Sequence, residues 1–483
     1  MTQTGILAFG AYIPRRRLQR AAIHAANKWF APGLAGLAKG ERAVANWDED
    51  AVTMAVEAAR DCLTGIDRAT VDGLTLASTT LPFADRLNAG IVKEALTLGD
   101  ATRATDAAGS LRAATSALLA AFESDRTQLC VAADLRKARA ASEGELMQGD
   151  GAAALLVGRG DVIARVLATH SVTSDFVDHF RRAGATFDYG WESRWIRDEG
   201  YTRLLGGAIG DALAAAGIAA ETTDHLVVPV SVRGVADGLA KKLGVRAEAV
   251  ADALQATVGD TGTAHPLLML AAVLEQATPG QRILVAGFGQ GADVLLLETT
   301  EALARLPRRR GVQGHLAARQ PDDNYQRFLF HRGLVELERG MRAELDQKQP
   351  GSTLYRHRKA VLGLVGGRCT KTGTVQFPRS DISVNPNDRA VGTQEDYPLA
   401  DRPARIVTYT ADSLSYSPDP PTYYGTIDFD GGGRLVAVFA EASAADIEVG
   451  RAMRMVFRIN AVDEQRDFIK YFWKAVPANE GEG

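Results

Sequence analysis

The stretch Thr105-Asp106-Ala107-Ala108-Gly109-Ser110-Leu111-Arg112-Ala113-Ala114-Thr115-Ser116 decides the fold of this chain. Its small residues predict a buried strand that ends in a tight turn, and the apolar residues after it predict a buried helix. In α/β enzymes such a turn can present a nucleophile at a helix N-terminus, where the partial positive charge of the helix stabilises an anion. This turn contains no cysteine. The first question is therefore whether the chain is an enzyme or only has the framework of one.

The composition of the 483 residues bounds the class of protein. Hydrophobic residues make up 46% and charged residues 24%, which is typical of a soluble globular protein, and the length predicts two or three domains. A formal charge of −4 gives no reason to expect nucleic acid or an anionic membrane as a partner. No apolar run reaches the roughly 20 residues of a membrane helix. Three widely spaced cysteines fit a reducing compartment, so we expect a cytoplasmic protein.

Strands and helices alternate through the first half of the chain. Residues 71–78 and 128–133 are predicted as strands, and Asp48-Glu49-Asp50 begins a helix with acidic residues at its N-terminus. Such alternation predicts a mostly parallel sheet covered by helices. We expect one half to comprise residues 1–160 and a second, similar half to comprise residues 161–305.

Four motifs carry a family resemblance over roughly residues 5–300. They are Gly10-Ala11-Tyr12-Ile13-Pro14-Arg15, the segment 48–60, the Gly149-Asp150-Gly151-Ala152-Ala153 turn and the segment 174–181. The last lies where the family carries a "SDTPDFWR"-like sequence. In order and spacing this half resembles archaeal-type hydroxymethylglutaryl-CoA synthases of the thiolase superfamily. The resemblance implies an α/β thiolase-like fold, with two similar halves and mixed sheets around buried helices, and a homodimer formed through this domain.

The same resemblance assigns the catalytic positions. In the family a cysteine accepts an acyl group from acyl-CoA, a carboxylate removes a proton from a second acyl-CoA, and a histidine polarises its carbonyl. These three positions fall at Ala108, Thr79 and Pro229, and an asparagine of the oxyanion site falls at Asp260. An alanine has no nucleophilic atom. The resemblance therefore implies a domain that performs no covalent acyl transfer in the family's manner.

Other residues remain as alternatives. His265 follows the Asp260 turn and is a candidate for the site, with Asp260 as its partner, although a role at the start of a helix is the alternative. Cys130, in an apolar strand, is interpreted as a small buried hydrophobic residue. Cys62 lies on an early helix and Ser110 has no histidine near it in sequence, so neither is a strong nucleophile candidate. Asp260 could also pair with Asp106 if their turns meet.

Coenzyme A contact is expected even without chemistry. Its phosphates suit arginine side chains, and Arg15, Arg17 and Arg233 lie near the positions of the family's CoA-binding loops. We predict that they bind a coenzyme A thioester, with a solvated basic face as the alternative.

The composition changes after residue 305. Pro307-Arg308-Arg309-Arg310-Gly311 and little apolar periodicity predict a linker over residues 306–322. An apolar stripe that runs from Tyr325 to Met341 predicts a helical segment within residues 323–360. Short β-like runs follow, with Gly431-Gly432-Gly433 as a hairpin turn.

Two motifs in this part carry a second resemblance, namely Gly366-Gly367-Arg368-Cys369-Thr370-Lys371-Thr372-Gly373 with Phe377-Pro378-Arg379, and Tyr471-Phe472-Trp473-Lys474. They resemble acyl-CoA-associated OB-fold proteins that carry a rubredoxin-like zinc ribbon. The resemblance implies a ribbon at residues 361–385 and an all-β OB-fold at 386–483.

The zinc ligands of such a ribbon are incomplete in this chain. A closed structural zinc site needs four ligands, and the family ribbon supplies two Cys-x2-Cys pairs. Here Cys369 is followed by Thr372, and adding His357 gives at most two ligands. We therefore expect a degenerate ribbon without zinc. Tyr416, Tyr423 and Tyr424 offer aromatic rings, but neighbouring aspartates argue against binding a polyanion.

Together these features predict a degenerate synthase-like domain fused to an OB-fold. We expect a non-catalytic, acyl-CoA-binding subunit that works with a separate catalytic thiolase. One alternative is an active acyl-CoA acyltransferase or C–C bond-cleaving enzyme with a non-standard site. The other is a protein that binds and senses acyl-CoA.

Overall fold

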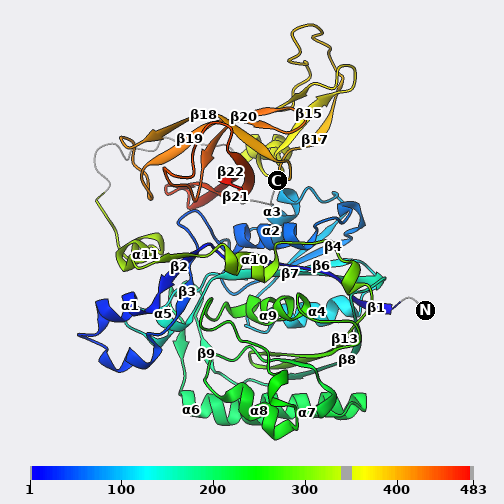
Figure 1. The fold of residues 1–483 in the computed structure, drawn as a ribbon, viewed down its shortest axis with the longest axis vertical. Coiled ribbons are helices and arrows are strands. Elements are labelled where there is room, and N and C mark those ends of the chain that lie inside the picture. Colours follow the sequence, from blue (N-terminus) through cyan, green and yellow to red (C-terminus); the bar gives the residue numbers. More distant parts are fainter. Residues whose placement is uncertain (1–2, 339–350, 479–483) are drawn as a thin grey trace. The chain divides into compact units, whose positions relative to one another are not determined.

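The computed structural model describes residues 3–338 and 351–478, drawn in Figure 1. The chain forms two compact units. Unit 1 comprises Met1–Asn46, Asp50–Val92 and Gly99–Leu334, and unit 2 comprises Trp47–Glu49, Lys93–Leu98 and Val335–Gly483. Within the described ranges, none of the helices has the length and apolar character that crossing a bilayer would require.

Unit 1 is built on nine strands in the order β11-β12-β13-β8-β1-β7-β6-β4-β5. Strand β4 pairs in parallel with both β5 and β6, and β11 pairs in parallel with β12. Near-continuous apolar runs explain four of these strands, β6, β7, β12 and β13, since most of their residues are buried. The strands are β1 (Gln3–Tyr12), β4 (Gly73–Ala77), β5 (Arg103–Ala107), β6 (Gln128–Asp134), β7 (Gly151–Gly160), β8 (Ala164–Thr173), β11 (His225–Val227), β12 (Arg282–Phe288) and β13 (Gly291–Thr299).

Helices fill the space between and outside these strands. Figure 1 shows α4 (Ala113–Phe122) and α9 (His265–Leu274) in a middle layer, with strands above and below them. Every residue of α9 is buried, which agrees with its wholly apolar sequence after His265. The helices α2 (Ala51–Cys62) and α10 (Gly311–Ala317) cover one outer face, and α7 (Gly206–Ala216) and α8 (Val235–Leu243) cover the other. Two similar halves around buried helices were predicted, and this arrangement is present.

Shorter elements complete unit 1. They are β2 (Arg16–Gln19), α1 (Arg20–Asn27), η1 (Pro32–Leu37), β3 (Glu41–Ala43), η2 (Arg68–Thr70), α3 (Asn88–Ala95, whose last residues belong to unit 2), α5 (Glu143–Met147), β9 (His179–Phe180), β10 (Tyr189–Gly190), α6 (Ser193–Trp195), the π-helix η3 (Ile196–Leu205), η4 (Ala220–Thr222), η5 (Ala247–Ala249), η6 (Gly262–Ala264), η7 (Leu303–Arg305), β14 (Gln320–Asp322) and α11 (Tyr325–His331).

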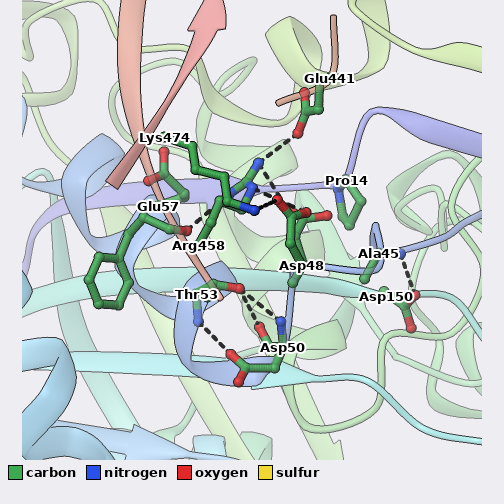
Figure 2. Close-up of polar contacts among 12 residues, drawn as sticks. Pro14, Ala45, Asp48, Asp50, Thr53, Glu57, Asp150, Glu441, Arg458 and Lys474 are labelled. Carbon is green, nitrogen blue, oxygen red and sulfur yellow. Dashed lines mark hydrogen bonds and ion pairs between the residues drawn. The ribbon is translucent and has the colours of Figure 1, made fainter. Parts of the chain in front are cut away.

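The start of α2 follows from its sequence. Asp50 accepts a hydrogen bond from the backbone N–H of Thr53 at 2.9 Å, and the Thr53 hydroxyl accepts one from the Asp50 N–H at 2.8 Å. This reciprocal pair is a capping box, and Figure 2 shows it. The predicted helix with an acidic N-terminus is therefore present, and Asp50 is the residue that caps it.

The expected linker over residues 306–322 instead folds as part of unit 1. Its helix α10 buries Val312 completely, and its strand β14 pairs in parallel with β2. Two carboxylates, one on α2 and one just after α9, accept from the amide of Arg310, which precedes α10, and from the first three amides of α10. Asp61 accepts from Arg310 and Gly311, and Glu275 accepts from Val312 and Gln313. These long-range contacts stabilise a helix that its own arginine-rich sequence does not predict.

Unit 2 contains a closed barrel of five strands in the order β18-β19-β20-β22-β21. A separate three-stranded sheet, β16-β15-β17, precedes it. The elements are α12 (Gly351–Arg356), α13 (Arg358–Val361), β15 (Val365–Cys369), β16 (Val375–Gln376), β17 (Gln394–Pro398), β18 (Ala404–Asp412), β19 (Thr422–Phe429), β20 (Arg434–Phe439), β21 (Ala452–Asp463) and β22 (Phe468–Pro477).

Three points of the expected layout of unit 2 can be compared with the structure. The hairpin at 431–433 joins β19 to β20, and all three glycines have positive φ, of 87°, 107° and 96°. The ribbon sheet extends to β17, so the barrel begins at Ala404 rather than at residue 386. Of the predicted helical segment 323–360, the described residues form α11, α12 and α13, whereas Met341 lies outside the described residues.

A buried ion network stabilises unit 2, and Figure 2 shows it. The ammonium of Lys474 lies 2.8 Å from the Asp48 carboxylate and 4.3 Å from the ring centre of Trp47. The guanidinium of Arg458 lies 3.1 Å from Glu49 and 2.6 Å from Glu441. Although burial acts in the opposite direction, Lys474 and Arg458 lower the pKa of Asp48. The network therefore keeps the Asp48 carboxylate ionised inside the unit.

Candidate functional site

Three neighbouring parallel strands end together in unit 1. Ala77 of β4 is paired with Ala107 of β5 and with Ala132 of β6. Because the carboxyl ends of parallel strands lie at one edge, the residues that follow them gather there. Thr79 and Ala108, two of the three positions assigned from the family resemblance, both follow these strands and lie at this strand-end site.

The centre of this edge is Asp134, at the end of β6, a residue that sequence reasoning missed. Its buried carboxylate accepts five hydrogen bonds, three from hydroxyls and two from backbone amides. The donors are Ser78 Oγ at 2.9 Å, Thr79 N at 2.8 Å, Thr79 Oγ1 at 3.0 Å, Thr80 Oγ1 at 3.0 Å and Thr263 N at 2.8 Å. The signal was present, because a charged residue that closes an apolar strand beside two parallel strands belongs at their common edge.

The hydroxyl of Thr79 is therefore already bound. Its Oγ1 donates to Asp134, and its carbonyl oxygen accepts a hydrogen bond from the guanidinium of Arg181. Five donors occupy the lone pairs of one carboxylate, so neither Thr79 nor Asp134 is poised to accept a proton from a substrate.

The Ala108 turn is more open than its sequence predicts. Ala108 and Gly109 are exposed, and a methyl group built on Gly109, where φ is +94°, would touch nothing within 4 Å. The reason is that β5 is the last strand in the order and one of its edges pairs with no other strand among residues 3–338 and 351–478, so the predicted buried strand is an edge strand. Its helix α4 does lie in the core, where Ala114 and Leu118 are buried.

Pro229 follows β11, at the opposite end of the strand order from β5. The backbone N–H of Val230 donates to Val228 O at 2.8 Å, which closes a tight turn around Pro229. The structure thus brings Thr79 and Ala108 together at one edge, whereas the hydrogen bonds and strand pairs described here do not join Pro229 to them.

The Asp260 turn is tied to the same edge. Asp260 forms an ion pair with the buried Arg136 at 2.9 Å, and Thr263, three residues on, donates to Asp134. Although burial acts to raise it, the Arg136 guanidinium lowers the pKa of Asp260 to about 2. Asp260 is thus ionised and paired, which makes it a poor proton acceptor near neutral pH.

His265 occupies the first position of α9 and is 1% exposed. Its Nδ1 accepts a hydrogen bond from the backbone N–H of Thr261 at 3.3 Å, and burial lowers its pKa. The charge of Asp260 acts to raise this pKa, in opposition to burial. However, His265 is enclosed at the helix start, so the geometry does not present it to a substrate.

A second set of contacts joins the Ala108 turn to the turn after β12. Ser110 Oγ donates to the carbonyl oxygen of Gly289 at 2.8 Å, and Arg112 donates to the same oxygen at 3.3 Å. Arg112 also pairs with the buried Asp293 at 2.8 Å. The Ser110 hydroxyl is therefore already engaged with a carbonyl oxygen.

Three further side chains considered from the sequence, Cys62, Cys130 and Asp106, are buried or hydrogen-bonded within the fold. Cys62 and Cys130 are fully buried, as predicted for Cys130, and burial raises the pKa of each thiol to about 12. Asp106 accepts hydrogen bonds from the backbone amides of Asn88 and Ala89 at the start of α3. The suggested pair of Asp106 with Asp260 is thus wrong, because Asp106 is committed to this helix.

The arginines expected to bind coenzyme A differ in environment. Arg233 is exposed and Arg15 is half-buried. Arg17 is completely buried, its guanidinium donates to the carbonyl oxygens of Pro14 and Arg16, and burial lowers its pKa to about 10. The expectation for Arg17 is therefore wrong, because its side chain turns inward from β2. Arg15 and Arg233 remain candidates.

The predicted ribbon segment of unit 2 forms a hydroxyl-lined turn around Cys369. The buried Cys369 Sγ lies 3.2 Å from the Thr393 hydroxyl. Hydrogen bonds from the side chains of Thr372 and Thr393 lower the pKa of the Cys369 thiol to about 6. Through the part of the chain that the structure describes, no three His, Cys, Asp or Glu side chains gather closely enough to hold a metal ion.

The fold and the strand-end site define a thiolase-like α/β domain joined to an OB-fold. Two family models match, "3-Oxoacyl-[acyl-carrier-protein (ACP)] synthase III C terminal" over residues 213–295 and "ChsH2, C-terminal OB-fold domain" over residues 397–458. A hydroxymethylglutaryl-CoA synthase of Archaeoglobus fulgidus is 31% identical over 346 residues, which cover 69% of this chain and 99% of the relative. The chain belongs to the hydroxymethylglutaryl-CoA synthase family.

Other relatives agree with this assignment. A hydroxymethylglutaryl-CoA synthase of Methanosarcina mazei is 28% identical over 349 residues, 69% of this chain and 99% of that protein. MvaS in complex with 3-hydroxy-3-methylglutaryl coenzyme A has a TM-score of 0.57 at 22% identity and covers 68% of this chain and 92% of its own. A hydroxymethylglutaryl-CoA synthase complexed with CoA has a TM-score of 0.58 at 19% identity, covering 72% and 95%. These two structures support the thiolase-like fold.

Proposed function

We propose that this chain binds acyl-CoA without forming an acyl-enzyme, as the non-catalytic subunit of a complex with a separate thiolase. The observation that carries the proposal is the chemistry of the strand-end site. The position assigned to the acyl-accepting cysteine is Ala108, and the position assigned to the carboxylate is Thr79, whose hydroxyl is bound to Asp134. Without a thiolate the family's covalent step has no acceptor.

Coenzyme A thioester is the proposed ligand. Two solved proteins of similar fold hold CoA or 3-hydroxy-3-methylglutaryl coenzyme A, and the family's reaction uses CoA esters. Arg15 and Arg233 are the arginines of this chain that we assign to its phosphates. The degenerate ribbon needs no zinc in this proposal, because hydroxyls surround Cys369.

The proposed partners are a second copy and a catalytic thiolase. Strand β5 ends the strand order and has exposed residues at Arg103 and Thr105, so its free edge suits pairing with the same strand of a second copy. The match to the ChsH2 OB-fold supports association of unit 2 in a larger complex. Three free cysteines fit the cytoplasm as the compartment of this assembly.

The intact mass of the full chain after incubation with several acyl-CoAs tests this proposal. We expect no acyl increment, saturable CoA binding, and copurification of a cysteine-bearing thiolase from the native host. A covalent increment would overturn the proposal in favour of an active acyltransferase with a non-standard site. Saturable binding with no copurifying thiolase would instead favour a protein that senses acyl-CoA.

Restoring a thiol sharpens this test. Ala108→Cys places a thiol in the exposed turn before α4, so we expect it to gain an acyl increment if acyl-CoA binds at this edge. Ala108→Ser is the matched control, because its hydroxyl is a far weaker nucleophile without an adjacent base. Ala108→Cys without an increment, in a protein that still binds CoA, would contradict binding of the thioester at the strand-end site.

A further inference from the structure

Strand β9 carries a histidine that is held by a carboxylate. The Nδ1 of His179 lies 3.0 Å from Oδ2 of Asp178, and the side-chain amide of Gln290 donates to Oδ1 of Asp178 at 3.1 Å. The side chain of Asp178 is 10% exposed and that of His179 is 21% exposed. The carboxylate is therefore enclosed and fixed from two sides, whereas the histidine keeps access to solvent.

This pair lies among the turns of the strand-end site. Gln290 follows Gly289, whose carbonyl oxygen accepts from Ser110, two residues after Ala108. Arg181, two residues after His179, donates to the carbonyl oxygen of Thr79. The segment from Asp178 to Arg181 thus spans from the Gly289 turn to the Thr79 turn, with His179 between these contacts.

A histidine whose Nδ1 is paired with a buried carboxylate is oriented as a proton acceptor. The Nδ1–H donates to Asp178, so Nε2 carries the lone pair that can accept a proton. A base oriented by a third group is the general arrangement for proton abstraction in enzymes. Here Gln290 orients the carboxylate in turn.

We propose that His179, positioned by Asp178, is a general base that removes a proton from the α-carbon of a bound acyl-CoA. This inference rests on the acyl-CoA binding of the proposed function, because it needs acyl-CoA at the strand-end site, and it replaces the non-catalytic role by proton exchange without covalent acyl transfer. The Cα–H bond breaks, the proton passes to Nε2 of His179, and the electron pair forms the thioester enolate. Return of a proton from the imidazolium regenerates the acyl-CoA. The step needs no nucleophile and no co-reactant.

The other polar groups of the site are less suited to this task. Asp134 accepts five hydrogen bonds, Asp260 is paired with Arg136, and His265 is enclosed at the start of α9. His179 also stands where the "SDTPDFWR"-like segment has a phenylalanine, so it is a departure of this chain from that motif. His179→Phe thus restores the motif residue and removes the proposed base in one change.

Exchange of α-protons in D2O tests the inference directly. The full chain is incubated with acetyl-CoA in D2O, the mass of the CoA ester is followed over time, and CoA-ester binding is measured separately by calorimetry. We expect deuterium uptake that His179→Phe slows by about 100-fold or more at unchanged binding, since general base catalysis contributes on the order of 10² to 10⁴. Asp178→Asn should slow it less. The control is His357→Phe, at an exposed histidine of unit 2, which should exchange like the wild type.

The outcomes separate this inference from the function on which it rests. Binding without exchange, or exchange that His179→Phe leaves intact, would overturn the role of His179 and leave the acyl-CoA-binding function standing. Absence of binding would overturn both. If the His179→Phe protein melts below the wild type, Asp178→Asn takes its place. Slower exchange by Asp178→Asn at unchanged binding would support the inference. Unchanged exchange would contradict it.

Discussion

Hydroxyl groups surround an acidic side chain at two places in this molecule, and the two places differ in what the hydroxyls do. At the strand-end site of unit 1, Ser78, Thr79 and Thr80 donate to Asp134. In the ribbon of unit 2, Thr372 and Thr393 bond to Cys369. The first acid is a carboxylate, and its hydroxyl partners join separate segments of the chain. The second, with an ordinary pKa of 9.0, ionises near neutrality only because its neighbours lower that pKa to about 6.

The comparison shows two uses of threonine and serine hydroxyls beside an acidic side chain. A hydroxyl is small and both donates and accepts, so it can satisfy a buried group that a larger ligand residue would otherwise serve. Around Asp134 five donors fix three separate segments of chain. Around Cys369 fewer donors are present, and they lower the pKa of the thiol. We therefore expect disruption of the first cluster to affect stability most, and disruption of the second to affect mainly the thiol.

The largest effect is expected for Asp134→Ala. Five donors lose their acceptor in a buried place, and each unsatisfied buried donor costs about 1–3 kcal/mol before the site relaxes. We predict a loss of about 3–5 kcal/mol in the free energy of unfolding, measured by urea denaturation.

The control for this variant is Asp161→Asn, which breaks a surface ion pair. Asp161 bonds to Arg305 at 2.8 Å, but its side chain is 76% exposed. Such pairs contribute about 0–1 kcal/mol, so its midpoint should stay close to the wild type. Equal midpoints for the two variants would show that Asp134 does not organise the strand-end site.

The sequence predicted the layers of unit 1 but not this cluster. Periodicity and the family motifs identify strands and buried helices, because burial of apolar residues leaves a local pattern. The donor residues lie 54 to 129 residues away from Asp134 in the sequence, so no local pattern marks the cluster. If the parallel pairing of β4, β5 and β6 is predicted, it places Asp134 beside Thr79.

Two other differences have the same physical origin. The basic run before α10 predicts a linker, yet Asp61 on α2 and Glu275 just after α9 accept from the amides at its start and make it part of the unit. The sequence predicts that Arg17 is a solvent-facing cation, yet its side chain is buried and donates to backbone carbonyl oxygens. In both cases the tertiary fold decides the outcome, because it brings Asp61 and Glu275 to α10 and because it buries Arg17, whose carbonyl acceptors lie only one and three residues away.

An intermediate effect is expected for Asp260 in acid. Its folded pKa of about 2 lies below its ordinary value of 3.8, so the folded state binds this proton less readily than the unfolded state. Its contribution is complete above about pH 4 and is lost as the pH falls towards 2, and it amounts to about 2 kcal/mol. Urea midpoints between pH 5 and 2 should thus fall more steeply for the wild type than for Asp260→Asn. Parallel curves for the two proteins would contradict a stabilising Asp260–Arg136 pair.

The smallest effect on the fold is expected at Cys369, where the readout is the thiol itself. Because burial raises the pKa of Cys62 and Cys130 to about 12, thiolate absorbance that appears between pH 5 and 8 reports Cys369. A lowered pKa means that the thiolate stabilises the folded state at high pH and that this stabilisation is lost as the pH falls through about 6. Thr393→Val removes one of the hydroxyls and should move the midpoint upward, whereas Thr410→Val, at an exposed position of β18, should leave it unchanged. A wild-type midpoint near 9 would show that the hydroxyls fill the turn without lowering the pKa of Cys369. The hydroxyls around Asp134 and those around Cys369 would then have the same role, and the comparison would fail.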